Sequence, residues 1–437
     1  MDCQKGEAHL TERMPQMSTS RLQLQIISRY APAPNRSGPL TYLFDLMAHL
    51  ASNGFDLELV ILDAWFDEHR LDAAVRNMAS VSILRLAPPT TLESPFSLKS
   101  LLRPLYRRLP EQLMIPARSA WYRIRNKPLP GIHPHDAPAT PEEQGFVAER
   151  IAAFQPQVVL ANHTCLGNLF ENRTRFQGRL TAILTHHIES QRTNDFQQAR
   201  LAVAHDSAWN AEQEQALLRH ADVLIAIQRD DAEMLRRMAP QAEIVVAPMS
   251  AKFIAHHEGE RIQGRCLFVG SNIDHNAHGM AWFLRDVWPR VVEQEPQATL
   301  HVCGTVCESL QAFAAPNVRL LGRVDDLNAE YGAAEVCVIP LIAGSGLKIK
   351  LIEALSHGRA CVATSVGVQG VQELTDRAVL VADAPEAFAE RVISLLQHSE
   401  KRTFMEEEAR KYVDEHLTPE KAYQPFINFL HNDRCEN

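Results

Sequence analysis

Short apolar runs alternate with amphipathic segments along almost the whole chain, and this alternation limits the possible folds more than any other feature. Short runs separated by helical patterns predict parallel strands joined by crossover helices. Seven runs lie before residue 250, at 22–28, 55–62, 81–86, 156–161, 180–185, 221–227 and 243–247. We therefore expect a doubly wound α/β domain over residues 21–250.

The same alternation resumes after a polar stretch at 248–263, which predicts an interdomain linker. Six further runs lie at 266–269, 298–303, 318–321, 335–339, 360–363 and 379–382. Because 437 residues exceed one ordinary core, we expect a second Rossmann-like domain over 262–417. The carboxyl ends of the strands in two such domains face a central cleft, where ligands bind. Residues 1–20 are polar and mixed in charge, and we expect a disordered terminus there.

The composition excludes several classes of protein. Apolar residues make up 46% and charged residues 22%, as in a soluble globular protein. The net charge of −9 gives no reason to expect a nucleic-acid partner. Four of the eight cysteines fall in expected buried strands, which suits reduced thiols in the cytoplasm: Cys266, Cys303, Cys337 and Cys361. The spacing of cysteines and histidines predicts no metal site.

The segment from Gly344 to Gly358 is the strongest candidate for a ligand site. It follows the apolar run 335–339 and precedes a helical pattern whose apolar face begins at Leu347. Strand, glycine loop and helix together present free N–H groups and the positive end of a helix dipole to an anion. Two glycines allow a ligand to approach the backbone, and the serine between them supplies a hydroxyl: Gly344, Ser345 and Gly346.

Charged side chains strengthen this prediction. Lys348 and Lys350 fall in the expected first turn of the helix, where they oppose its dipole and a bound anion would offset the cost. Glu353, one turn later, offers a carboxylate to neighbouring hydroxyls. The alternative is an ordinary loop between a strand and a helix, with Lys350 in solvent and Glu353 as a surface charge.

The stretch Gly344-Ser-Gly-Leu-Lys-Ile-Lys-Leu-Ile-Glu-Ala-Leu355, followed by Gly358-Arg-Ala-Cys-Val-Ala-Thr364, resembles the donor-binding signature of retaining glycosyltransferases of family 4. The resemblance is most specific over 265–385, which includes Gly270 in Phe268-Val-Gly-Ser271. It implies the GT-B fold, in which two Rossmann-like domains are joined by a C-terminal helix, here at 418–437, that returns to the first domain. It also implies a nucleotide diphosphate sugar as the donor substrate, no cofactor and no metal.

The resemblance also implies roles for single residues of the loop. Lys348 would contact the diphosphate and act in catalysis, and Glu353 would hold the ribose hydroxyls of the nucleotide. The glutamate that the family has eight residues before Glu353 is replaced here by Ser345. Either the Ser345 hydroxyl and nearby N–H groups take over its contact with the donor sugar, or the site is impaired.

Histidines follow two strands of the first domain. His163 follows the run 156–161, and His186 and His187 follow the run 180–185. The resembled family places a histidine near the donor sugar, and His186 matches it best; histidine orients hydroxyls or transfers protons near neutral pH. Because consecutive residues leave a strand on opposite sides, we expect only one of the pair to face the cleft. A purely structural histidine is the alternative.

Three further residues belong to the predicted site. Glu189 and Arg192 are suited to bind hydroxyls or phosphate of the acceptor, beside His163. Gly38 lies in the turn after the first strand, and the resemblance implies that this turn contacts donor or acceptor.

An insertion at 95–140 reverses the charge of the chain locally. Residues 99–127 contain eight basic side chains, one acidic side chain and interleaved leucines and aromatic residues. Such a segment is typical of a peripheral contact with an anionic membrane surface, here the inner face. A solvated helical insertion that packs on the first domain is the alternative.

Together these features predict a cytoplasmic glycosyltransferase that moves a hexose-type sugar from a nucleotide diphosphate donor to a glycan or lipid-linked acceptor, with retention, in cell-envelope or polysaccharide biosynthesis. The first alternative is a catalytically weak GT-B homologue that binds a nucleotide sugar or a partner, since Ser345 replaces a glutamate. The second is an epimerase on the same scaffold.

Overall fold

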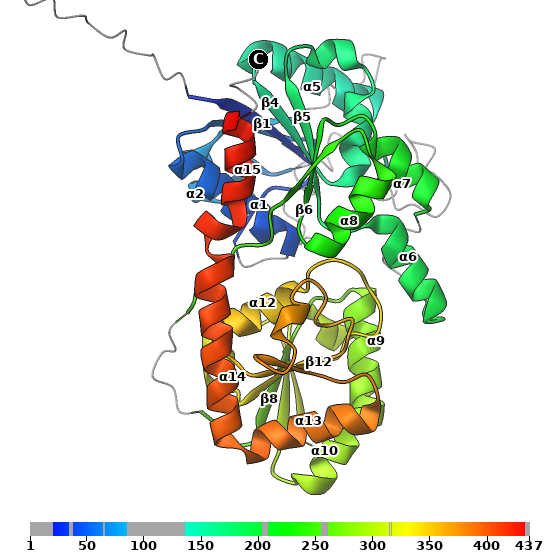
Figure 1. The fold of residues 1–437 in the computed structure, drawn as a ribbon, viewed down its shortest axis with the longest axis vertical. Coiled ribbons are helices and arrows are strands. Elements are labelled where there is room, and N and C mark those ends of the chain that lie inside the picture. The colour runs from blue at the N-terminus through cyan, green and yellow to red at the C-terminus, as the bar shows by residue number, and fades with distance from the viewer. Residues whose placement is uncertain are drawn as a thin grey trace, which may run out of the picture.

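The computed structural model describes residues 21–34, 38–63, 66–84, 136–202, 209–254, 261–313, 315 and 317–432. They form two α/β domains, one above the other along the long axis of the molecule (Figure 1). Each domain has a single parallel sheet with helices on both faces, which confirms the predicted doubly wound architecture. The expected disordered terminus at 1–20 and almost all of the basic insertion lie outside the described residues.

The first domain contains a seven-stranded sheet in the order β3-β2-β1-β4-β5-β6-β7. Its strands are β1 (Gln23–Ser28), β2 (Asp56–Ile61), β3 (Ser80–Ile83), β4 (Val158–Asn162), β5 (Leu180–Thr185), β6 (Val223–Ala226) and β7 (Glu243–Val246). Its helices are α1 (Gly38–Ser52), α2 (Ala73–Met78), α5 (Pro141–Phe154), α6 (Glu189–Gln198), α7 (Ala211–Leu218) and α8 (Arg229–Met238). The central strands β1, β4 and β5 are buried on both faces, which explains their continuous apolar sequences.

The second domain contains a six-stranded sheet in the order β10-β9-β8-β11-β12-β13. Its strands are β8 (Arg265–Val269), β9 (Thr299–Cys303), β10 (Val318–Gly322), β11 (Val336–Ile339), β12 (Cys361–Ala363) and β13 (Val379–Val381). Its helices are α9 (Asp274–Trp282), α10 (Trp288–Gln294), α11 (Leu327–Ala333), α12 (Ile349–Ser356), α13 (Pro385–Gln397) and α14 (Ser399–Tyr412). The strand order reverses between β8 and β11, so the loops after these two strands flank the position where such sheets bind ligands.

The last helix, α15 (Pro419–Asn432), leaves the second domain and packs on the first, as predicted (Figure 1). Its buried face includes Tyr423, whose ring meets the ring of Tyr42 of α1 at 5.7 Å. The Tyr423 hydroxyl accepts a hydrogen bond from the backbone N–H of Ser250 at 3.2 Å. The amphipathic sequence of α15 therefore contributes to the core of a domain that begins nearly four hundred residues earlier.

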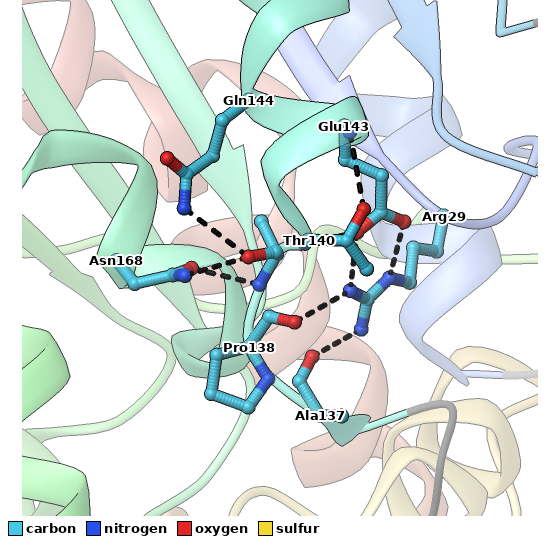
Figure 2. Close-up of polar contacts among 8 residues, drawn as sticks. Arg29, Ala137, Pro138, Thr140, Glu143, Gln144 and Asn168 are labelled. Atoms are coloured by element: carbon cyan, nitrogen blue, oxygen red, sulfur yellow. Dashed lines mark hydrogen bonds and ion pairs between the residues drawn. The ribbon is translucent and has the colours of Figure 1, made fainter. Parts of the chain in front are cut away.

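Buried polar contacts fix the chain where α5 begins, beside the carboxyl end of β1 (Figure 2). The Arg29 guanidinium donates to the carbonyls of Ala137 and Pro138 and pairs with Glu143 at 2.9 Å. Asn168 exchanges two hydrogen bonds of 2.8 Å with the backbone of Ala139. The chain that follows the basic insertion is thus attached at the edge of the sheet that carries the candidate site.

Within the described ranges, every helix is too short or too polar to cross a bilayer.

Candidate functional site

The glycine loop between β11 and α12 meets the first domain directly. The Ser345 hydroxyl donates to the carbonyl of Ile188 at 3.1 Å. A methyl group built on Gly346 would lie 2.9 Å from Cβ of His187 and 3.0 Å from the carbonyl oxygen of His186. Gly346 also has a φ of +80°, so both its conformation and this close approach require glycine. The loop therefore lies in the interface between the domains.

Lys348 occupies a different position from the predicted one. It is the N-cap of α12 and not part of its first turn, because its φ and ψ of −88° and 92° are extended. Its ammonium donates to the carbonyl of Gly346 at 2.6 Å, to Oε1 of Gln369 at 2.9 Å and to the carbonyl of Gly344 at 3.4 Å. Burial lowers the pKa of Lys348 to about 7. The three donors of Lys348 therefore hold the loop, and a bound anion would have to displace one acceptor.

Lys350 and Glu353 lie next to each other on α12. Lys350 is half-buried, and burial lowers its pKa to about 8. Burial raises the pKa of Glu353, whereas a hydrogen bond from the Tyr331 hydroxyl and the charge of Lys350 oppose that increase. The Tyr331 ring stacks on His357 at 4.2 Å, which fixes its orientation. Tyr331, which we did not predict, thus orients the carboxylate proposed to bind hydroxyls.

The two consecutive histidines point in different directions. His186 is buried within the first domain, with Nε2 2.8 Å from Oδ1 of Asn162 and its ring 4.3 Å from that of His163. Burial lowers the pKa of His186 far below its ordinary value and that of His163 to about 4. His187 lies opposite Gly346 instead. The residue that faces the second domain is therefore His187, although His186 matched the resembled family better.

Glu189 connects His187 to the acceptor-side residues. Its Oε2 lies 3.0 Å from Nε2 of His187 and 2.8 Å from a guanidinium nitrogen of Arg192. Burial alone would raise the pKa of Glu189, but these two partners outweigh it and the pKa is lowered. The Glu214 carboxylate accepts the N–H groups of Glu189 and Ser190 at 2.8 and 2.9 Å, which fixes the start of α6. The predicted residues Glu189 and Arg192 are therefore brought together with His187.

The two remaining predicted glycines, Gly38 and Gly270, have close neighbours that leave little room for a side chain. A methyl group on Gly38 would lie 1.7 Å from Cδ1 of Ile349, so α1 begins against the first residue of α12. Gly270 follows β8 and lies next to Phe268 and Asn276.

His275 is a site residue that the sequence reasoning missed. A methyl group on Gly344 would lie 3.5 Å from its Cβ and 3.8 Å from its Nδ1. The only available signal was its place just after β8, at the carboxyl edge of the sheet. Among the residues that the structure describes, no three His, Cys, Asp or Glu side chains gather as a metal site.

Two parallel α/β domains that meet through the loops at the carboxyl ends of their strands, joined by a returning C-terminal helix, define the GT-B class of protein. Solved structures with low sequence identity share this fold over nearly the whole chain. Sucrose-phosphate synthase from Thermosynechococcus elongatus is 16% identical, with a TM-score of 0.67, covering 95% of this chain and 100% of that one. Anabaena HepE in complex with UDP and glucose is 12% identical, with a TM-score of 0.62, covering 94% and 100%.

A third structure is a mutant of S. aureus TarM in complex with fondaparinux, α-GlcNAc-glycerol and UDP. It is 8% identical, with a TM-score of 0.65, covering 93% of this chain and 99% of that one. The sequence model of the family described as Glycosyl transferases group 1 matches residues 263–398. The match lies within the second domain, which is therefore similar to members of that family.

A curated relative matches part of the chain. It is an uncharacterized 44.6 kDa protein in the cps region of Klebsiella pneumoniae, 22% identical over 168 residues. The match spans 36% of this chain and 43% of that relative.

Proposed function

We propose that this protein is a glycosyltransferase that moves a sugar from a nucleotide diphosphate donor to a glycan or lipid-linked acceptor, with retention of anomeric configuration. One observation supports this function most directly. The glycine loop that precedes Lys350 and Glu353 contacts His187 and the carbonyl of Ile188, and Glu189 pairs with both His187 and Arg192. A donor bound at the loop would thus have its reacting carbon next to an acceptor side that already carries hydrogen-bonding and charged groups.

The leaving diphosphate needs positive groups where its charge develops. Lys350 and the start of α12 supply them, and Lys348 adds a third if the anion replaces one of its loop acceptors. The Glu353 carboxylate, oriented by Tyr331, accepts hydroxyls of the nucleotide ribose. No step in this scheme requires a metal, so turnover should be unchanged after treatment with EDTA. A loss of turnover that Mg²⁺ or Mn²⁺ restores would contradict this part of the proposal.

The test is a thermal-shift panel of nucleoside diphosphates and nucleotide sugars, followed by transfer assays with the stabilising donor. Wild-type protein should be stabilised by one nucleotide class, and Lys350→Ala and Glu353→Gln should each weaken that stabilisation and lower turnover. Unchanged nucleotide affinity and turnover in both variants would overturn the assignment. The coupling constant of the anomeric proton in the NMR spectrum of the product reports whether the configuration is retained.

A second candidate function is a nucleotide-sugar or partner-binding protein of low catalytic activity. It is favoured by Ser345, whose hydroxyl is bonded to Ile188 where the resembled family has a carboxylate. Persistent donor binding without transfer to any acceptor, and without donor hydrolysis, would favour this candidate. Release of free nucleotide and an altered sugar without an acceptor would instead indicate an epimerase.

The relative in a cps region supports a role in polysaccharide biosynthesis. We propose that residues 99–127 hold the protein at the inner face of the membrane through their eight basic side chains. Sedimentation with anionic liposomes should decrease with salt and with substitution of the arginines. Binding that is indifferent to both would discard the membrane role.

A further inference from the structure

The side chain of His275 has a buried nitrogen without a partner at the candidate donor site. His275 is the second residue of α9, which follows β8, and its ring packs beside Gly344 of the glycine loop. Nδ1 is enclosed and has no hydrogen-bond partner within the described part of the chain. A buried polar atom left without a partner costs about 1–3 kcal/mol, so such an atom needs an explanation.

Positively charged side chains approach this ring from both domains. Lys350 and Lys348 approach from the start of α12, and Arg192 approaches from the first domain. Burial is the main reason why the pKa of His275 lies far below its ordinary value, and these charges lower the pKa further. Of the first-domain acids, Glu189 is already paired with His187 and Arg192, and the charges of Asp231 and Asp195 act on Lys348. His275 is therefore neutral in the free protein and lies in a region of positive potential.

An anion at this position would give Nδ1 a hydrogen-bond partner and would lower the local positive charge. An Nδ1–H group would donate to an anionic oxygen, and the negative charge would offset the charges of Lys350, Lys348 and Arg192. Resting on the proposed function, we propose that His275 binds the diphosphate of the donor through Nδ1 and takes up a proton as the donor binds. The proton comes from solvent and stays on the ring until the diphosphate leaves, so the step needs no other reactant.

The direction in which anion binding shifts the pKa of His275 determines the pH at which the test is made. An anion raises the pKa of His275, so binding takes up protons at any pH between its free and bound values. Lys348 and Lys350 have pKa values of about 7 and about 8, so both already carry protons at about pH 6. At about pH 6 the difference in proton uptake between wild-type protein and a His275 variant therefore reports His275, because the ligand phosphate contributes equally to both, whereas uptake near neutral pH also includes the lysines.

The experiment is isothermal titration of the full chain at about pH 6 in two buffers of different ionisation enthalpy. UDP, GDP and ADP are the nucleotide probes, and inorganic pyrophosphate is the anion probe. Wild-type protein should take up close to one proton more per ligand bound than His275→Asn. The Asn side chain keeps a hydrogen-bond donor but cannot take up a proton, and the affinity of this variant should be about tenfold lower.

His398→Asn is the matched control, since His398 is exposed at the junction of α13 and α14. It should bind and take up protons like wild-type protein, and equal melting midpoints without ligand show that both variants fold. Equal proton uptake by wild-type protein and His275→Asn on binding would overturn the inference. If only pyrophosphate binds, with uptake that depends on His275, the anion site stands and the proposed function fails. If neither probe binds, both fail.

Discussion

Single residues decide what the candidate site presents to a ligand, and several do so through contacts that no sequence pattern specifies. Tyr331 is the clearest case. Its hydroxyl bonds the Glu353 carboxylate, and its ring is held by His357. A carboxylate that keeps one fixed donor loses less rotational freedom when it accepts ribose hydroxyls.

We therefore predict that Tyr331→Phe weakens nucleotide binding by about threefold to tenfold, because Glu353 loses its orienting hydrogen bond. The effect should be smaller for the 2′,3′-dideoxy nucleotide, which lacks the hydroxyls that Glu353 is proposed to bind. Tyr412→Phe is the control, since Tyr412 donates to Glu373 at 2.7 Å on the outer side of the domain. Equal losses for both nucleotides would show that Tyr331 has only a structural role.

The sequence predicted several residues that lie around the glycine loop, but not the orientations of their side chains. The order of apolar runs and the glycine loop identified Lys348, Glu189 and the histidine pair. Which histidine faces the second domain depends on Asn162, which holds His186 inside the first domain. The direction of the Lys348 side chain depends on the backbone of the loop that it contacts. Such long-range contacts have no local signal in the sequence.

At the scale of helices and strands, the sequence predicted positions better than it predicted the orientations of single side chains. Buried parallel strands require continuous apolar residues, so all thirteen strands fall on predicted runs. The helix α12 begins at Ile349, two residues after the expected start at Leu347, since Lys348 is extended and bonds Gly346 and Gly344. The return of α15 was predicted from the resemblance, and its apolar face explains it.

We predict that Phe426→Ala lowers the free energy of unfolding by about 3–5 kcal/mol, because Phe426 is fully enclosed between α15 and the first domain. The measurement is a urea titration followed by circular dichroism. Phe404→Ala is the control: Phe404 is 54% exposed on α14, so its change should stay within about 0.5 kcal/mol. Equal effects would mean that α15 contributes little to the core.

At the scale of the whole molecule, the two domains touch through side chains that the sequence could not pair. Besides the Ser345 contact, Gln372 donates to Asp230 at 2.7 Å, and His278 lies 2.8 Å from the carbonyl of Ala202. Relative motion of the domains would break these contacts, and a donor that enters the loop from solvent has to pass between them.

We predict that Gly346→Ala prevents this close approach, because the new methyl group would collide with His187 and the His186 carbonyl. Turnover should decrease at least tenfold, and the radius of gyration from small-angle scattering should increase. Gly54→Ala is the matched control, since Gly54 also has a positive φ, of +85°, but has no atom within 4 Å of the new methyl group. It should lose about 1 kcal/mol of stability and keep its turnover. Similar turnover in the two variants would show that the contact is dispensable.

The position of α15 has a consequence for synthesis on the ribosome. The first domain obtains its final helix only after the entire second domain has been translated, at about 5–20 residues per second. Until then, the surface around Tyr42 that α15 covers stays open to solvent and to chaperones for roughly ten seconds or more. Premature termination before Pro419 would thus damage the half of the protein that was made first.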